Sequence, residues 1–149
     1  MASSLKSRLQ DDMKAAMRAR DSQRLGIIRL INAAIKQREV DERIDLDDEQ
    51  VLVVLSKMIK QRNDSIEQYA KAARQDLVEQ ERYEKKVIEE YLPPPLGDEE
   101  LASLIDKAIA STGAQTIKDM GKVMGALKAQ VQGRADMGVV GARIKARLS

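Results

Sequence analysis

The sequence contains neither cysteine nor histidine among its 149 residues. Without thiols and imidazoles it cannot form a zinc site from those ligands, a cysteine nucleophile or a Ser-His-Asp triad. The usual general base near neutral pH is also missing, because that role commonly belongs to histidine. We therefore expect no metal, no bound cofactor and no catalytic residue in this chain acting alone.

Aromatic residues and long apolar runs are scarce as well. Three tyrosines are present with no phenylalanine or tryptophan, which argues against a base-stacking platform for single-stranded nucleic acid. No apolar run approaches the roughly 18 residues that would predict a membrane-spanning helix. The N-terminal segment "MASSLKSRLQDDMKAAMRAR" has no unbroken apolar stretch, so it predicts neither a secretory signal nor a typical transit peptide. A cytoplasmic location is the default expectation.

Helical periodicity dominates the chain and predicts an all-α fold. A first helix ends near residues 19–21, and Asp21 is expected to cap a second helix that reaches about Val40. Asp47 and Gln50 form a capping signature for a third, long helix. Apolar residues repeat along one side of this helix, and Arg62 interrupts this stripe. We interpret Arg62 either as an arginine extending to solvent from the bundle edge or as a ligand-facing group. The stripe consists of Leu52, Leu55, Ile59, Arg62, Ile66, Tyr69 and Ala73.

Three consecutive prolines in "LPPPLGDEEL" predict a domain boundary, because they stop a helix and hold the chain extended. The predicted organisation is an N-terminal domain over residues 1–92, a four-helix bundle with long helices. A proline-rich linker follows over residues 93–97. A small three-helix domain occupies residues 98–149. Asp98 is expected to cap its first helix, Gly113 to end that helix, and Thr116 with Asp119 to open the next one.

Glycine and positive charge coincide in the C-terminal segment. Residues 114–149 hold seven basic and two acidic side chains, and six of the eight glycines fall in the last 37 residues. Gly121 and Gly125 lie four apart, on one face of a predicted helix. Either they seat a second helix inside the domain, or they permit close approach of an outside backbone such as RNA. The predicted phosphate contacts are Lys118, Lys122, Lys128, Arg134, Lys145 and Arg147.

Two stretches resemble a known family: "ARQDLVEQERYEKKVIEEYLPPPLGDEEL" and "IKDMGKVMGALKAQVQGRAD". Both closely resemble the YqeY family of small bacterial proteins, and the resemblance extends over essentially the whole chain. That family shares its C-terminal domain with the tail of the B subunit of the Asp-tRNA/Glu-tRNA amidotransferase. The matching pieces are Asp76-Leu77, Glu81, Glu84, Tyr91-Leu92-Pro93, Glu99-Glu100-Leu101, Asp119-Met120-Gly121, Val123-Met124 and Gly133-x-Ala135-Asp136.

The resemblance implies a two-domain, all-α protein whose C-terminal domain is similar to one that contacts tRNA. By association it also implies carbon–nitrogen ligase chemistry with glutamine as amide donor. However, the chain has neither a Ser-Lys amidase motif nor a Gly-rich phosphate loop. The preferred hypothesis is a non-catalytic tRNA-associated adaptor. The main alternative is a protein-interaction module that docks on an aminoacyl-tRNA synthetase or an amidotransferase subunit, and a true ligase is the third.

Overall fold

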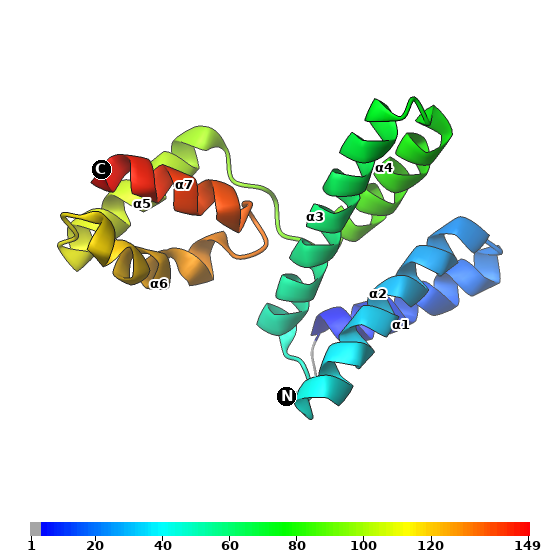
Figure 1. Cartoon of the computed structure of the whole chain (residues 1–149). Helices are drawn as coiled ribbons and strands as arrows, with labels where there is room; N and C mark the ends of the chain where they lie inside the picture. Colours follow the sequence, from blue (N-terminus) through cyan, green and yellow to red (C-terminus); the bar gives the residue numbers. More distant parts are fainter. Residues whose placement is uncertain (1–3) are drawn as a thin grey trace. The chain divides into compact units, whose positions relative to one another are not determined.

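The computed structural model describes residues 4–149, and within this range the chain is all-helical with no strand (Figure 1). The prediction of an all-α fold is therefore confirmed. The chain divides into two compact units, the first ending at Leu92 and the second beginning at Pro93. The helices are α1 (Ser4–Ala19), α2 (Ser22–Glu42), α3 (Asp48–Lys71), α4 (Gln75–Glu89), α5 (Asp98–Thr112), the 3₁₀ turn η1 (Ile117–Asp119), α6 (Met120–Val131) and α7 (Met137–Leu148).

The first unit consists of two helical hairpins, α1–α2 and α3–α4, which both contribute to one hydrophobic core (Figure 1). Apolar side chains spaced by three and four residues form one buried stripe on each helix. Tyr91, just after α4, is buried with them, and its hydroxyl donates to the Asp12 carboxylate. The buried core residues are Leu9, Ala16, Ile27, Ile28, Ile31, Ile35, Leu46, Val51, Val54, Leu55, Met58, Val87, Ile88 and Tyr91.

The predicted helix starts in this unit are confirmed. Asp21 Oδ1 accepts a hydrogen bond from the Arg24 backbone N–H at 3.1 Å, which satisfies one of the free donors at the start of α2. Asp47 and Gln50 form a reciprocal capping box, with N···O distances of 2.9 and 3.0 Å. These contacts are local, so the sequence alone contains the information for them.

The long stripe predicted on α3 is only partly buried. Leu55 is fully buried, whereas Ile66 and Tyr69 are half-buried and Ala73 is exposed beyond the end of the helix. The buried residues of α3 all lie in its first half, at Val51, Val54, Leu55 and Met58, and α4 is the helix against which α3 packs most extensively.

Arg62 fits neither of its two interpretations. It turns inward toward α4, where its Nη2 lies 3.4 Å from Glu84 Oε1 and its Nε lies 3.9 Å from Glu81 Oε2. Its side chain is 15% exposed, and Nε has no hydrogen-bond partner. Arg62 is therefore an interior cation that neutralises two carboxylates between the helices of the α3–α4 hairpin.

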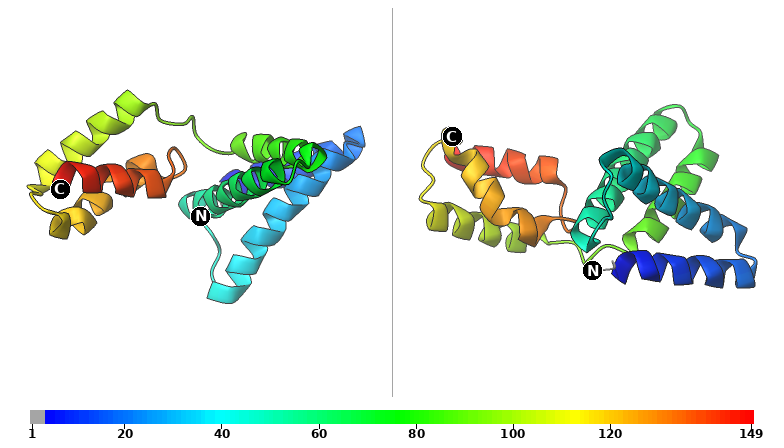
Figure 2. Two further views of the ribbon diagram at one scale, coloured as in Figure 1. Left: turned by 45° about the horizontal axis from the view of Figure 1, so that its top comes forward. Right: turned by 90° about the horizontal axis from the view of Figure 1, so that it is seen from below.

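The second unit packs α5, α6 and α7 around a core of its own (Figure 2). Gly113 ends α5 with φ of +68°, a left-handed conformation that confirms its predicted role. Asp98, by contrast, is the first helical residue, and Gly97 occupies the cap position without a side-chain hydrogen bond. The buried residues are Leu101, Ile105, Ala108, Val123, Leu127, Val131, Val140, Ile144 and Leu148.

Part of the predicted proline linker is held by the second unit. The Leu96 backbone N–H donates to the Arg134 carbonyl at 2.8 Å, and Arg134 Nε donates to the Pro94 carbonyl at 3.0 Å. Arg134 follows Gly133, which turns the chain between α6 and α7 with φ of +77°. The extended segment is thus fastened to this turn at two points.

Candidate nucleic-acid interface

The outward side of α6 carries glycines and lysines together, and we call Lys118, Gly121, Lys122, Gly125 and Lys128 the glycine–lysine face. All five residues are exposed, whereas Val123, Leu127 and Val131 of the same helix are buried. Spacings of three and four residues place the two sets on opposite sides of the helix. Lys118 belongs to η1, the short turn that leads directly into α6.

No helix of the second unit covers the two glycines. A Cβ atom added to Gly121 or Gly125 would have no heavy atom within 4 Å, apart from the immediate backbone of its own helix. The interpretation that this pair seats a second helix inside the domain is therefore wrong. At Gly141, by comparison, an added Cβ would lie 3.4 Å from Met120 Cε, an ordinary contact with the end of a flexible side chain.

The start of the glycine–lysine face is organised by Asp119. Its Oδ2 accepts from the backbone N–H groups of Gln115 and Thr116, at 3.0 and 3.3 Å, which supplies the acidic half of the predicted capping signature. The same backbone hydrogen bonds lower the pKa of Asp119. Lys122 lies 4.0 Å from this carboxylate, but its side chain is 72% exposed. The ammonium group of Lys122 therefore remains available to an outside ligand.

The predicted cations divide into two groups. Lys118, Lys122 and Lys128 share the glycine–lysine face, and Lys145 is exposed on α7. Arg134 holds the proline segment and lies 3.8 Å from Glu100, while Arg147 forms an ion pair with Asp106 of α5. The two arginines are therefore engaged within their own unit. Only the three lysines adjoin the exposed glycines.

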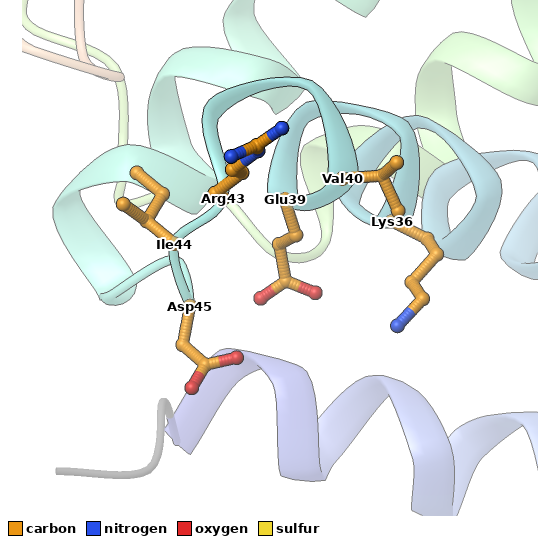
Figure 3. A pocket seen from close by; sticks show the side chains of 6 residues that line it. All are labelled: Lys36, Glu39, Val40, Arg43, Ile44 and Asp45. Carbon is orange, nitrogen blue, oxygen red and sulfur yellow. The ribbon is translucent and has the colours of Figure 1, made fainter.

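Within residues 4–149, no group of three or more Asp or Glu side chains is arranged to hold a metal ion. A polar hollow of about 250 Å³ lies where α2 turns toward α3, lined by Lys36, Glu39, Val40, Arg43, Ile44 and Asp45 (Figure 3).

Glu39, the half-buried carboxylate of this hollow, has a structural role. It pairs with Lys6 of α1 at 2.6 Å and accepts from the Leu46 backbone N–H at 2.9 Å. The hydrogen bond from Lys6 has the largest effect in lowering the pKa of Glu39, and the hydrogen bond from the Leu46 backbone has the next largest. Glu39 is therefore a poor general base. Its contacts fasten the turn after α2 to α1.

Comparison with known proteins matches residues 6–148 to the family described as Yqey-like protein. The chain belongs to this family. Relatives of this Yqey-like chain are named "Altered inheritance of mitochondria protein 41, mitochondrial". The relative from Kluyveromyces lactis is 43% identical over 84 residues, 56% of this chain and 45% of the relative. The relative from Pyrenophora tritici-repentis is 32% identical over 130 residues, 86% of this chain and 71% of the relative.

The relative from Lachancea thermotolerans is 44% identical over 85 residues, 56% of this chain and 46% of the relative. The aligned part thus spans less than half the length of two of these three proteins. Their names place them in mitochondria, which contradicts the expectation of a cytoplasmic location. That expectation rested on missing targeting signals, and nothing in a folded helical domain identifies its compartment. None of the helices within residues 4–149 is long and apolar enough to span a membrane.

Proposed function

We propose that this Yqey-like protein is a non-catalytic RNA-binding adaptor that contacts tRNA through the glycine–lysine face of α6. The observation that carries the proposal is that Gly121 and Gly125 are uncovered and lie among three exposed lysines. Glycine in a helix interior destabilises it by roughly 0.5–1 kcal/mol relative to alanine. No packing contact within the second unit offsets that cost. Close approach of an outside ligand would therefore explain why glycine occupies both positions.

The chemistry of the face suits a phosphate–sugar backbone. Lysine ammonium groups neutralise phosphates, and the missing Cβ atoms let a backbone approach the helix surface closely. Such contacts do not read base sequence, and the chain has no Trp or Phe on which bases could stack. We therefore expect binding that follows the shape and charge of the RNA and that needs no cofactor.

Replacing Lys122 with glutamine should weaken tRNA binding and reduce its dependence on salt. One lost phosphate contact lowers the slope of log affinity against log salt concentration by about 0.7–0.9. The measurement is a fluorescence-anisotropy titration with unfractionated tRNA at several salt concentrations. Lys107→Gln is the matched control, because Lys107 is an exposed lysine of α5 in the same unit. Equal loss in both variants would mean that only net charge matters, and would contradict a defined face.

Replacing Gly125 with alanine should stabilise the protein while weakening RNA binding. The new methyl group meets no neighbour, so α6 gains roughly 0.5–1 kcal/mol of helix propensity. Bound RNA would have to move away from that methyl group, and its affinity should fall. Thermal unfolding followed by circular dichroism, together with the same tRNA titration, measures both effects. Higher stability with unchanged affinity would show that this glycine has no part in binding.

A further inference from the structure

We propose that the α1–α2 hairpin provides a second RNA-backbone contact surface, formed by Lys14 and Arg18 of α1 with Arg29 and Lys36 of α2. We call these four residues the basic face. The proposal shares its polyanionic partner with the proposed function, but it rests on different residues in the other unit.

These cations receive little compensation within residues 4–149. Lys36 is the exception, because its charge contributes to the lowered pKa of Glu39, although Lys6 is the main partner of that carboxylate. All four side chains are exposed, and none forms an ion pair within residues 4–149. The other basic residues of the two helices behave differently. Lys6 pairs with Glu39, Arg24 with Glu90, and Arg38 with Glu42.

Most carboxylates of the hairpin are already engaged. Asp12 accepts from the Tyr91 hydroxyl, Asp21 caps α2, and Asp41 accepts from Gln37 Nε2 at 2.9 Å. Glu39 and Glu42 belong to the ion pairs just described. Asp11 is the remaining exposed carboxylate of α1, at three positions before Lys14. The positive charge of the basic face is therefore only partly compensated by its surroundings.

The two pairs of cations lie on the same side of the α1–α2 hairpin. Met13 Sδ lies 3.8 Å from Asn32 Nδ2 and Lys6 lies 2.6 Å from Glu39, so α1 and α2 run antiparallel along their contact. Each successive residue turns by about 100° around a helix.

Lys14 follows Met13, whose sulfur contacts Asn32 of α2, while Arg29 lies three residues before Asn32 and Lys36 four residues after it. When two antiparallel helices are viewed from the same end, successive side chains turn clockwise around one helix and anticlockwise around the other. Relative to this contact, the basic residues of each helix are rotated in one sense and the buried residues in the other, so both pairs of cations lie on the side of the hairpin away from the core. The buried residues used for this comparison are Leu9 and Ala16 of α1 and Ile28 and Ile35 of α2. Arg18 lies four residues after Lys14 and continues the same row.

The arrangement suits a polyanion better than a membrane. Lys14 and Arg18 are separated by about 6 Å along the helix axis, and Arg29 and Lys36 by about 10.5 Å. The phosphates of a nucleic-acid backbone are regularly spaced, so several of them can contact these cations at once without requiring an exact arrangement of the side chains. An interfacial helix needs a continuous stripe of large apolar residues. The exposed large apolar side chains of α1 and α2 are Met17, Leu30 and Val40, which are too few and too widely spaced for such a stripe.

The test is the triple variant Lys14→Gln, Arg29→Gln and Lys36→Gln of the full chain, titrated with unfractionated tRNA at several salt concentrations. The log–log salt slope should fall by about 2–2.7, and affinity at low salt should fall at least about tenfold, for three lost phosphate contacts. The matched control is Lys57→Gln, Lys60→Gln and Arg82→Gln, which removes the same charge from exposed positions on the α3–α4 hairpin. Circular dichroism should show unchanged helicity in both variants.

Each other result overturns the inference. An unchanged slope in the triple variant, or an equal fall in the control, removes the basic face as a site. Binding to vesicles rich in phosphatidylglycerol, without binding to tRNA, would identify a membrane contact instead. Lys122→Gln distinguishes the two proposals: if it weakens binding and the triple variant does not, the α6 proposal stands and this one fails. The reverse result would leave the basic face as the RNA contact and refute the glycine–lysine face.

Discussion

Replacing Arg62 with methionine should lower the free energy of unfolding of the first unit by about 3–5 kcal/mol. Arg62 is the cation that faces Glu81 and Glu84 in the largely buried interior of the α3–α4 hairpin. Removing one partner of such a group leaves charges without compensation where water is scarce. Methionine keeps an unbranched apolar side chain of similar reach, so most of the packing is retained. Urea unfolding followed by circular dichroism measures the loss.

Glu81→Gln is the matched control, because it removes charge from the same cluster with the opposite expectation. Burial, and then the charge of Glu84, raise the pKa of Glu81 despite the opposing effect of Arg62. A carboxyl group whose pKa is higher in the folded state binds its proton more tightly there. Its contribution to stability is therefore fully present below the pKa of the unfolded chain and is lost as pH rises through the higher pKa of the folded state.

Glutamine at position 81 should accordingly leave stability at neutral pH unchanged or slightly higher, and flatten its rise between neutral and mildly acidic pH. A loss of less than about 1 kcal/mol in Arg62→Met would place the arginine among ordinary surface ion pairs. That result would contradict an interior role for the cluster.

Replacing Leu127 with alanine should unfold the second unit while leaving the first folded. Leu127 is fully buried at the centre of α6, and truncating a buried leucine costs about 2–5 kcal/mol. A unit of this size has a small core and correspondingly little stability to lose. Hydrogen exchange measured by mass spectrometry should show loss of protection in α5–α7 and normal protection in α1–α4.

Ile28→Ala provides the comparison, since it makes the same kind of cavity in the core of the first unit. This variant should lower protection from hydrogen exchange in α1–α4. Because the core of the first unit is larger, that unit is more able to stay folded despite the lost stability. If Leu127→Ala instead abolished protection throughout the chain, the two units would unfold as one cooperative body. The proline segment would then not separate two independently stable domains.

The candidate interface was accessible from the sequence only in part. Spacing alone placed Gly121 and Gly125 on one face of a helix and put lysines beside them. Whether that face is covered depends on where α5 and α7 lie, which spacing does not reveal. The structure leaves it uncovered, and it assigns Arg134 and Arg147 to contacts within the unit. The Arg134–Pro94 and Arg147–Asp106 contacts join residues about 40 positions apart in the chain, so no local pattern indicates them.

The basic face could not be recognised from the sequence for a related reason. Residues 1–40 hold nine basic and four acidic side chains, but a count does not show which charges are paired. The pairing of Arg24 with Glu90 and the engagement of Asp12 by Tyr91 depend on α4 lying against α2 and on the residues just after α4 reaching α1. Only after those contacts are known do Lys14, Arg18, Arg29 and Lys36 stand apart as cations that form no ion pair within residues 4–149.

By itself the sequence determined the helical class, the capping of α2 and α3, and the left-handed turn at Gly113. These features depend on side chains within a few residues of one another, so the local sequence carries the information for them. The tertiary structure alone decided that Arg62 faces two carboxylates, that Gly121 and Gly125 are uncovered, and that α3 is buried mainly in its first half. Each of these depends on which helix lies opposite, and packing between distant segments settles that through the burial of apolar surface.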